Sequence, residues 1–340
     1  MTEQTLLEVN NLKVYFPLRN GFMGRTTGHV KAVDDVSFAI QRGETLGLVG
    51  ESGSGKTTLG RSILRAIDPT SGEINFRFNG DRVDLATMRE ADLYEYRKYM
   101  QMIFQDPYSS LNPRMTVRDI IAEPLVAMGL ASGEALEETI RETAQRCRLN
   151  LEHLRRFPHA FSGGQRQRIG IARSLVSNPQ FIVCDESVSA LDVSIQADIL
   201  NLLMDLQTEL NLTYLFIAHD LSVVAHISTR VAVMYVGQLV ELAPTRKLFY
   251  APKHPYTEAL LSAIPDLDPD KNMAQVHLTG EIPNPADPPA GCRFHTRCPY
   301  AEAKCKTDIP VWQEINEDHF VACHFANELS LTGVASSEPA

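Results

Sequence analysis

Residues 50–57 read Gly50-Glu51-Ser52-Gly53-Ser54-Gly55-Lys56-Thr57, which matches the phosphate-binding loop pattern G-x-x-x-x-G-K-[S/T] at every fixed position. The apolar run 45–49 before it is typical of a buried strand, and residues 58–64 after it are typical of a helix. Glycines let backbone N–H groups curl around phosphate oxygens, and a helix N-terminus adds partial positive charge. The stretch therefore predicts a nucleoside triphosphate site, in which Lys56 bridges the outer phosphates and Thr57 ligates Mg²⁺.

A second stretch, Phe181-Ile182-Val183-Cys184-Asp185-Glu186, is an apolar strand that ends in two carboxylates. Asp185 is placed to hold Mg²⁺ through water, and Glu186 to polarise a water for attack on the γ-phosphate. Strands that end in acidic residues before a turn are common, so this stretch alone is a weak signal.

A third stretch, Ser162-Gly163-Gly164-Gln165, opens an expected helix that continues to Arg173. Free N–H groups and a serine at a helix start form a second anion site. Two phosphate-type sites in one chain indicate that each nucleotide is shared between two chains.

Two further segments, Ser189-Ala190-Leu191-Asp192 and Ala218-His219-Asp220, follow in order. Together the five segments resemble the ATP-binding cassette (ABC) ATPase family in order and spacing, over roughly residues 7–250. Gln105 sits where that family has its Q-loop glutamine. Taken alone, Gln105 and Asp192 would be ordinary surface residues, and His219 would be a core or capping histidine.

The resemblance implies a role for each matching residue. Glu186, His219 and Gln105 are expected to be catalytic, and Thr57, Gln105 and Asp185 to hold Mg²⁺. Asp192 would lie across a head-to-tail dimer interface, where the signature contacts the γ-phosphate held by the opposite subunit. The expected nucleotide-binding residues are Phe16, Gly50, Glu51, Ser52, Gly53, Ser54, Gly55, Lys56, Thr57, Thr58, Ser162, Gly163, Gly164, Gln165 and Asp192.

The adenine-stacking aromatic has two candidates, Tyr15 and Phe16, and a Gly-rich insert from Arg19 to Gly28 blurs the alignment. We favour Phe16, since neighbouring strand residues point to opposite faces and Tyr15 would point into the sheet. The chain departs from the family pattern at Phe161, where leucine is usual, and at Ser187, where proline is common. Neither departure touches a catalytic group.

The expected fold class is α/β, a P-loop NTPase of ABC ATPase type with a mostly parallel core sheet. An antiparallel β-subdomain, an inserted helical subdomain at about 106–180 and a C-terminal extension complete it. The ATP-binding domain is expected at 7–250, the extension at 251–330 and a disordered tail at 331–340.

Composition agrees with this assignment. The chain has 340 residues, 44% of them hydrophobic, which suffices for a full core and exceeds one cassette. A net charge of −10 argues against a nucleic-acid partner. Since no run of about 18 apolar residues occurs, any membrane-spanning partners are expected to be separate chains.

The C-terminal region narrows the subfamily. His254-Pro255-Tyr256-Thr257, a Pro-rich connector at 280–289 and a cysteine-containing segment resemble the second ATPase subunit of dipeptide/oligopeptide importers. That resemblance implies a second ABC ATPase subunit as heterodimer partner, two permease subunits and an extracytoplasmic peptide-binding protein. It also implies location at the cytoplasmic face of a bacterial inner membrane, with ATP and Mg²⁺ as cofactors. Nickel and glycosides are alternative cargoes of the same ATPase type.

Four of the six cysteines, Cys292, Cys298, Cys305 and Cys323, lie in this region. In a cytoplasmic protein such a group favours metal binding over disulfides. Zinc sites usually pair cysteines two to four residues apart, which is closer than the spacing here. The wide spacing, Pro299 and the resemblance favour a [4Fe–4S] cluster, with zinc or reduced thiols as alternatives.

Two other function classes were weighed. A soluble ABC ATPase acting on ribosomes normally carries two cassettes, and one acting on DNA separates P-loop and signature by a long coiled coil; neither pattern occurs here. A non-catalytic binding module is disfavoured by the complete catalytic set. The sequence therefore predicts the ATP-hydrolysing subunit of a peptide importer.

Overall fold

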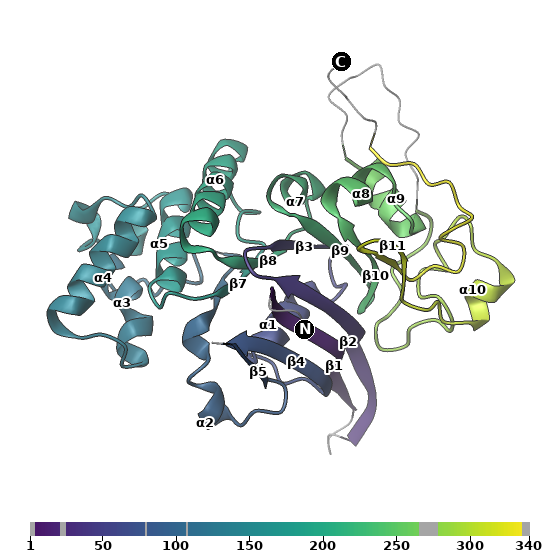
Figure 1. Ribbon diagram of the computed structural model, residues 1–340, viewed down its shortest axis with the longest axis horizontal. Coiled ribbons are helices and arrows are strands. Elements are labelled where there is room, and N and C mark those ends of the chain that lie inside the picture. Colours follow the sequence, from purple (N-terminus) through teal and green to yellow (C-terminus); the bar gives the residue numbers. More distant parts are fainter. Residues whose placement is uncertain (1–3, 21–24, 79, 107, 265–277, 335–340) are drawn as a thin grey trace.

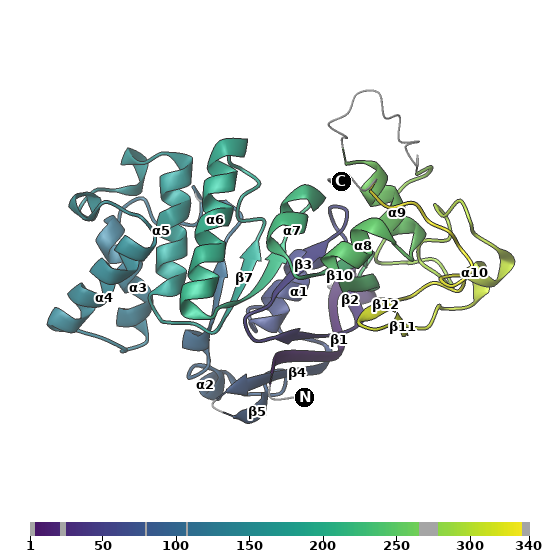
Figure 2. The same cartoon turned by 45° about the horizontal axis from the view of Figure 1, so that its top comes forward.

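Two β-sheets carry the fold in the part of the chain that the computed structural model describes, residues 4–20, 25–78, 80–106, 108–264 and 278–334 (Figure 1). The larger sheet lies at the centre of the molecule, and the smaller sheet packs beside it. Helices form a separate group at one end, and the C-terminal extension lies at the other, in both views (Figures 1 and 2).

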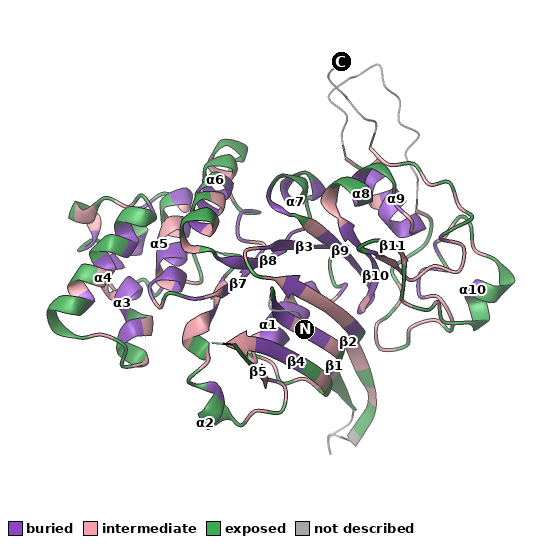
Figure 3. Cartoon of the chain, viewed as in Figure 1, coloured by how far each residue is buried: buried purple, intermediate pink, exposed green. Residues whose placement is uncertain are grey.

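The larger sheet is mostly parallel, as the sequence predicts. Its parallel part runs from β6 through β7, β8 and β3 to β9, and β10 and β12 add antiparallel strands. In spatial order its strands are β11 (Gln313–Asn316), β12 (His319–Val321), β10 (Gln238–Pro244), β9 (Arg230–Tyr235), β3 (Thr45–Val49), β8 (Thr213–Ile217), β7 (Phe181–Asp185) and β6 (Met100–Ile103). Every residue of β3, β7 and β8 is buried, which is typical of parallel strands covered on both faces (Figure 3).

The smaller sheet is the expected antiparallel β-subdomain. Its spatial order is β2 (Arg25–Gln41), β1 (Thr5–Asn20), β4 (Ser71–Phe78) and β5 (Asp81–Asp84). The short strands predicted at 7–9 and 36–40 lie within the much longer β1 and β2. These strands also extend into the Gly-rich insert at 19–28, because pairing continues to Asn20 and Arg25; residues 21–24 lie outside the described part.

Helices flank the central sheet and form the inserted helical subdomain. α3, α4 and α5 pack on one another. Each helix buries apolar residues that are spaced three or four apart along it, including Ile120 on α3, Ile140 on α4 and Ile169 on α5. The helices are α1 (Lys56–Ile63), α2 (Glu90–Leu93), α3 (Val117–Ala127), α4 (Gly133–Arg146), α5 (Gly163–Leu175), α6 (Val193–Leu210), α7 (Leu221–Ile227), α8 (Thr245–Tyr250), α9 (Pro255–Ser262) and α10 (Ala303–Thr307), with 3₁₀ turns at Arg97–Tyr99, Leu151–His153 and Pro158–Ala160.

The C-terminal extension is continuous with the cassette. Its strand β12 pairs with β10 and so enlarges the central sheet. The Pro-rich connector contacts β2, because the Lys31 N–H donates to the Pro285 carbonyl. In the segment predicted to be disordered, Thr332 N–H bonds to the Glu258 carboxylate and Val334 N–H to the Phe249 carbonyl; residues 335–340 lie outside the described part. Among the described residues, none of the helices combines the length and the apolarity needed to cross a bilayer.

Candidate functional site

The phosphate-binding loop connects β3 to α1, as its motif predicts. Its glycines are required by close backbone approach. A Cβ on Gly50 would lie 2.1 Å from the Met234 carbonyl oxygen, and one on Gly55 would lie 2.1 Å from that of Ala32. Both residues also have positive φ, 150° and 108°, which side chains disfavour. The loop is therefore packed tightly against β2 and β9.

Lys56 is 5% exposed and its ammonium turns back into the loop. Nζ donates to the carbonyls of Gly50 at 2.7 Å and Glu51 at 3.0 Å. Burial lowers the pKa of Lys56, while Glu186, Asp185 and Glu51 act in the opposite direction. The ammonium is thus a desolvated cation at the position where the motif places phosphates.

The Thr57 hydroxyl donates to the Asp185 carboxylate at 2.9 Å. Asp185 ends β7 and is 1% exposed, and its burial raises the pKa of the carboxyl. Two hard oxygen atoms side by side are ligands that suit Mg²⁺, which also takes water and substrate phosphate. The pair fits the predicted metal site.

Glu186, Gln105 and His219 converge on one carboxylate oxygen. The Gln105 amide donates to Glu186 Oε2 at 2.7 Å, and His219 Nδ1 lies 3.6 Å from the same oxygen. Glu186 has a φ of 45°, a left-handed conformation that non-glycine residues adopt rarely and that often marks functional sites. The structure therefore brings the three predicted catalytic residues together beside Asp185.

The signature segment opens α5 with a capping box. The Ser162 hydroxyl accepts from the Gln165 N–H at 3.4 Å, and the Gln165 side chain accepts from the Ser162 N–H at 3.1 Å. A Cβ on Gly164 would lie 2.4 Å from Ile195 of α6, so this glycine allows α5 and α6 to approach. In the described residues, no hydrogen bond or ion pair joins Ser162 or Asp192 to the P-loop, and both side chains are exposed.

The Q-loop segment is linked to α5 by two arginines. The Arg166 guanidinium lies 4.2 Å from the centre of the Tyr108 ring, and that of Arg173 lies 5.5 Å from the Phe104 ring. Arg173 also donates to the Ser110 carbonyl at 2.6 Å. A displacement of the segment after Gln105 would therefore be transmitted to α5, the helix that the signature segment opens.

The two adenine candidates differ in what holds them. The Tyr15 hydroxyl donates to the Asp34 carboxylate, and burial together with this bond raises the pKa of Tyr15. Phe16 is 39% exposed. Phe16 remains the predicted stacking residue.

Sequence reasoning missed a set of contacts between the extension and the P-loop. Arg297 donates to the two Glu51 carboxylate oxygens at 2.6 and 3.0 Å, and the Glu51 N–H donates to the Tyr256 hydroxyl at 2.8 Å. No motif marks Arg297, and its position 246 residues after Glu51 hides the contact. The extension therefore contacts the P-loop directly.

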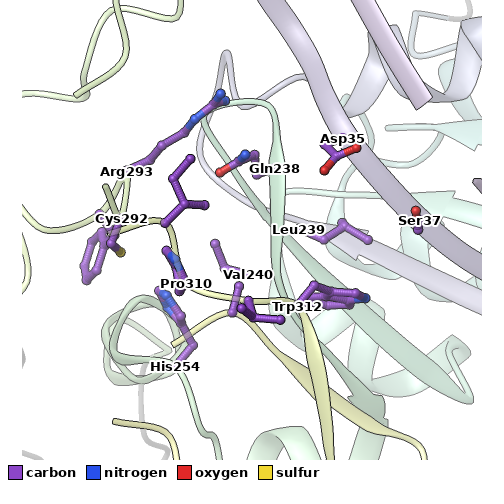
Figure 4. A pocket seen from close by; sticks show the side chains of 14 residues that line it. Asp35, Ser37, Gln238, Leu239, Val240, His254, Cys292, Arg293, Pro310 and Trp312 are labelled. Carbon is purple, nitrogen blue, oxygen red and sulfur yellow. The ribbon is translucent and has the colours of Figure 1, made fainter. Parts of the chain in front are cut away.

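A second contact joins the extension to β2. Arg293 donates to the Asp34 carboxylate and to the Val236 carbonyl. It lines a cavity of about 300 Å³, with Cys292, His254 and Trp312 among the other lining residues (Figure 4). No motif in the sequence predicts this cavity.

The four C-terminal cysteines line one small cavity of about 20 Å³, together with His254 and Phe294. Burial raises the pKa of Cys292 to about 11 and that of Cys298 to about 12. In the described ranges, no group of three or more His, Cys, Asp or Glu residues is placed to hold a metal ion. The cysteines thus meet as predicted, but they do not form a complete ligand set. Cys147 and Cys184 are buried core residues.

Comparisons with known proteins agree with the geometry. Residues 33–189 match the ABC transporter family profile, and residues 240–305 match the profile of the oligopeptide/dipeptide transporter C-terminal region. The chain is 51% identical to the oligopeptide transport ATP-binding protein AppF of Bacillus subtilis, over 95% of this chain and 98% of that protein. It is 50% identical to a putative peptide import ATP-binding protein of Brucella ovis, again over 95% and 98%.

Among solved structures, the chain resembles the dimeric ATP-binding cassette MJ0796 bound to ADP and phosphate. That likeness has a TM-score of 0.61 and 26% identity, and it covers 71% of this chain and 99% of the other. CbiO1 of Clostridium perfringens, part of an ABC transporter complex, matches with a TM-score of 0.61 and 25% identity, over 73% and 91%. The predicted fold class is confirmed.

Proposed function

The chain belongs to the ATP-binding proteins of the ABC transporter family, and we propose that it hydrolyses ATP to drive uptake of dipeptides or oligopeptides into a bacterial cell. The observation that carries the proposal is the convergence of Gln105 and His219 on Glu186. This group lies next to the Thr57–Asp185 pair, and Glu186 is close enough to Lys56 to influence its pKa.

Each residue of this group has a distinct task. Lys56 would exchange its loop carbonyl partners for phosphate oxygens, which are stronger acceptors because they are charged. Bound Mg²⁺, held by Thr57, Asp185 and Gln105, would neutralise charge on the β- and γ-phosphates. Glu186 would accept the proton of the attacking water, and His219 would orient that water and contact the γ-phosphate.

The signature is proposed to serve a second ATPase subunit. Ser162, Gly163, Gly164, Gln165 and Asp192 make no polar contact with this chain's own P-loop in the described residues, and Ser162 and Asp192 are exposed. A head-to-tail dimer would place them on the partner's nucleotide. The resemblance to the second ATPase subunit of dipeptide/oligopeptide importers favours a heterodimer over a homodimer.

A groove beside Gln105 is the proposed contact for the permease subunits. It has a volume of about 510 Å³ and is lined by Phe104, Pro124 and four arginines: Arg61, Arg65, Arg97 and Arg173. Basic lining favours a permease segment with acidic side chains or a helix C-terminus. This contact would hold the chain at the cytoplasmic face of the inner membrane. An extracytoplasmic binding protein would select the peptide cargo.

Iron is a further part of the proposal. The shared cavity of Cys292, Cys298, Cys305 and Cys323 supports a [4Fe–4S] cluster, for which four thiolates are the usual ligands. Ligation would require these side chains to move, because no metal-binding group is formed in the described residues. Zinc or reduced thiols are the alternatives that metal analysis distinguishes.

The decisive experiment is an ATPase assay of the chain reconstituted with its permeases and peptide-binding protein. ATP hydrolysis should rise when peptide-loaded binding protein is added, and peptide should accumulate in the vesicles. Stimulation by nickel or a glycoside in place of peptide would reassign the cargo. Absence of ATP binding by the purified chain would contradict the proposal.

A further inference from the structure

Glu51 places a carboxylate in the P-loop itself. Its backbone carbonyl accepts from Lys56 at 3.0 Å, so the residue borders the position of the phosphates. Like charges repel strongly at short range where water is partly excluded. An unpaired Glu51 would therefore oppose the binding of a triphosphate.

Arg297 neutralises that carboxylate from the C-terminal extension. The guanidinium donates to both Glu51 oxygens, at 2.6 and 3.0 Å, in the two-pronged geometry that makes such pairs strong. The Arg297 side chain is 7% exposed and that of Glu51 is 27% exposed, so solvent screens the pair little.

The same extension holds the backbone of Glu51. The Tyr256 hydroxyl accepts from the Glu51 N–H at 2.8 Å. Side chain and backbone of one P-loop residue are thus both bonded to residues beyond the cassette. This double attachment fixes the direction in which the loop leaves β3.

Arg297 also contacts Tyr235, which belongs to a cluster of aromatic side chains. The Tyr235 hydroxyl lies 3.4 Å from Arg297 Nη1, and the Tyr235 ring packs on Tyr256 with centroids 4.6 Å apart. Phe294 completes the cluster at 5.2 Å from Tyr235 and 5.3 Å from Tyr256. Because the guanidinium fork of Arg297 is planar and preorganised, less side-chain entropy is lost for each hydrogen bond that it makes with Glu51.

We infer that Arg297 is a positioning residue for nucleotide binding, which cancels the charge of Glu51 and, with Tyr256, holds the P-loop in its phosphate-binding shape. The inference rests on the proposed ATP-binding function. It assigns the extension a role in the nucleotide site, in addition to any role of its cysteines.

The test is a double-mutant cycle on nucleotide affinity, measured by titration calorimetry on the full chain. Arg297→Gln should weaken ATP binding about tenfold or more, the typical result of losing a hydrogen-bonded partner of a charged group. Glu51→Gln is the second arm of the cycle: it removes the carboxylate that repels the phosphates, so its loss of ATP affinity should be smaller than that of Arg297→Gln. The double variant should recover most of the affinity, since no unpaired carboxylate remains.

Two readouts separate this role from general destabilisation. The loss in Arg297→Gln should be larger for ATP than for AMP, because repulsion grows with phosphate charge. Arg148→Gln is the matched control: it breaks an exposed 2.6 Å ion pair with Asp205 and should leave ATP affinity unchanged. If Arg297→Gln does not fold, Glu51→Asp gives the same test, because its shorter carboxylate keeps the charge but withdraws from Arg297.

The outcomes distinguish the two proposals. A wild-type chain that binds no ATP would contradict the proposed function. A wild-type chain that binds ATP, with Arg297→Gln or Glu51→Asp equal to it, would overturn the role of Arg297. Two outcomes would overturn charge cancellation. One is a double variant that binds ATP as weakly as Arg297→Gln alone, and the other is a loss of affinity in Arg297→Gln that is equal for ATP and AMP.

Discussion

The side-chain amide of Gln105 donates to Glu186 Oε2 at 2.7 Å, and this bond joins the segment that leads from β6 into the helical subdomain to the residue that follows β7. Gln105 lies just after β6, between Phe104 and Tyr108, whose rings pack against Arg173 and Arg166 of α5. Glu186 directly follows β7. A partner that moves the segment after Gln105 would therefore act directly on the proposed general base.

Glu186→Gln should bind ATP but hydrolyse it at least about a hundredfold more slowly, because an amide cannot accept the proton of the attacking water. The shape of the side chain is kept, so ATP affinity should change little. Phosphate release by the assembled transporter is the measurement, and Glu142→Gln, an exposed α4 residue, is the control. Near-normal turnover would remove Glu186 from the base role.

Lys56→Ala should weaken ATP binding about tenfold or more, since a charge-assisted contact to phosphate is lost. Titration calorimetry of the isolated chain measures the effect. Lys247→Ala changes an exposed lysine of α8 and should bind ATP normally. Equal affinity in both variants would show that the P-loop assignment is wrong.

Ser162→Arg should bind ATP as the wild type does, yet block closure of the ATPase dimer, because its bulk and charge would lie at the partner's nucleotide. Built into Glu186→Gln, which should accumulate the ATP-bound dimer, the change should abolish the dimer peak in size-exclusion chromatography with the partner subunit. Asn201→Arg, exposed on α6, serves as control. A normal dimer in the Ser162→Arg background would refute the shared-site arrangement.

Anaerobic purification should yield about four irons per chain and a broad visible absorption that bleaches on reduction, as four-cysteine ligation of [4Fe–4S] requires. Cys298→Ser should release most of that iron, whereas Cys147→Ser, at a buried core position, should retain it. Colourless protein with about one zinc would support the zinc alternative. Protein with neither metal would contradict both.

The proximity of the candidate catalytic residues was predictable because they stand at fixed offsets in contiguous motifs. Lys56 and Thr57 lie in the loop and helix after β3, Asp185 ends β7 and Glu186 follows it, and parallel strands bring their carboxyl ends to one edge. The long hairpin of β1 and β2 was not predicted in full, because its outer part is glycine-rich and polar, and cross-strand pairing rather than local propensity holds it.

The contacts between the C-terminal extension and the P-loop could not be predicted from the sequence, for a different reason. Glu51 and Arg297 are each ordinary charged residues, and their pairing depends on how β10, α9 and the cysteine-containing segment fold back over the P-loop. The hydrophobic periodicity of a sequence predicts local secondary structure, but not which distant residues pair. Likewise, the presence of four cysteines in one region predicted that they lie close together. Their spacing in the sequence could not determine whether they form a complete ligand set.

Asp185→Asn should raise the melting temperature of the nucleotide-free protein at neutral pH. Burial raises the pKa of Asp185 above its ordinary value of 3.8, so the folded carboxyl holds a proton that the unfolded one releases as pH rises. The charged, buried group therefore costs stability above that range, and an amide removes the cost while its oxygen still accepts from Thr57. We expect a higher melting temperature than that of the wild type at pH 7, and little difference at a pH low enough to protonate the carboxyl in both the folded and the unfolded state.

The same variant should lose Mg²⁺-dependent ATP hydrolysis, because the carboxylate proposed to hold the metal is replaced by a neutral group. Calorimetric melting of Asp185→Asn and of Asp198→Asn, an exposed α6 residue, measures the stability effect across pH. A melting temperature of Asp185→Asn at or below that of the wild type at pH 7 would mean that Thr57 and the nearby Arg61 already compensate the buried charge. A higher melting temperature would instead identify Asp185 as a residue that destabilises the nucleotide-free protein and whose charge a bound cation would offset.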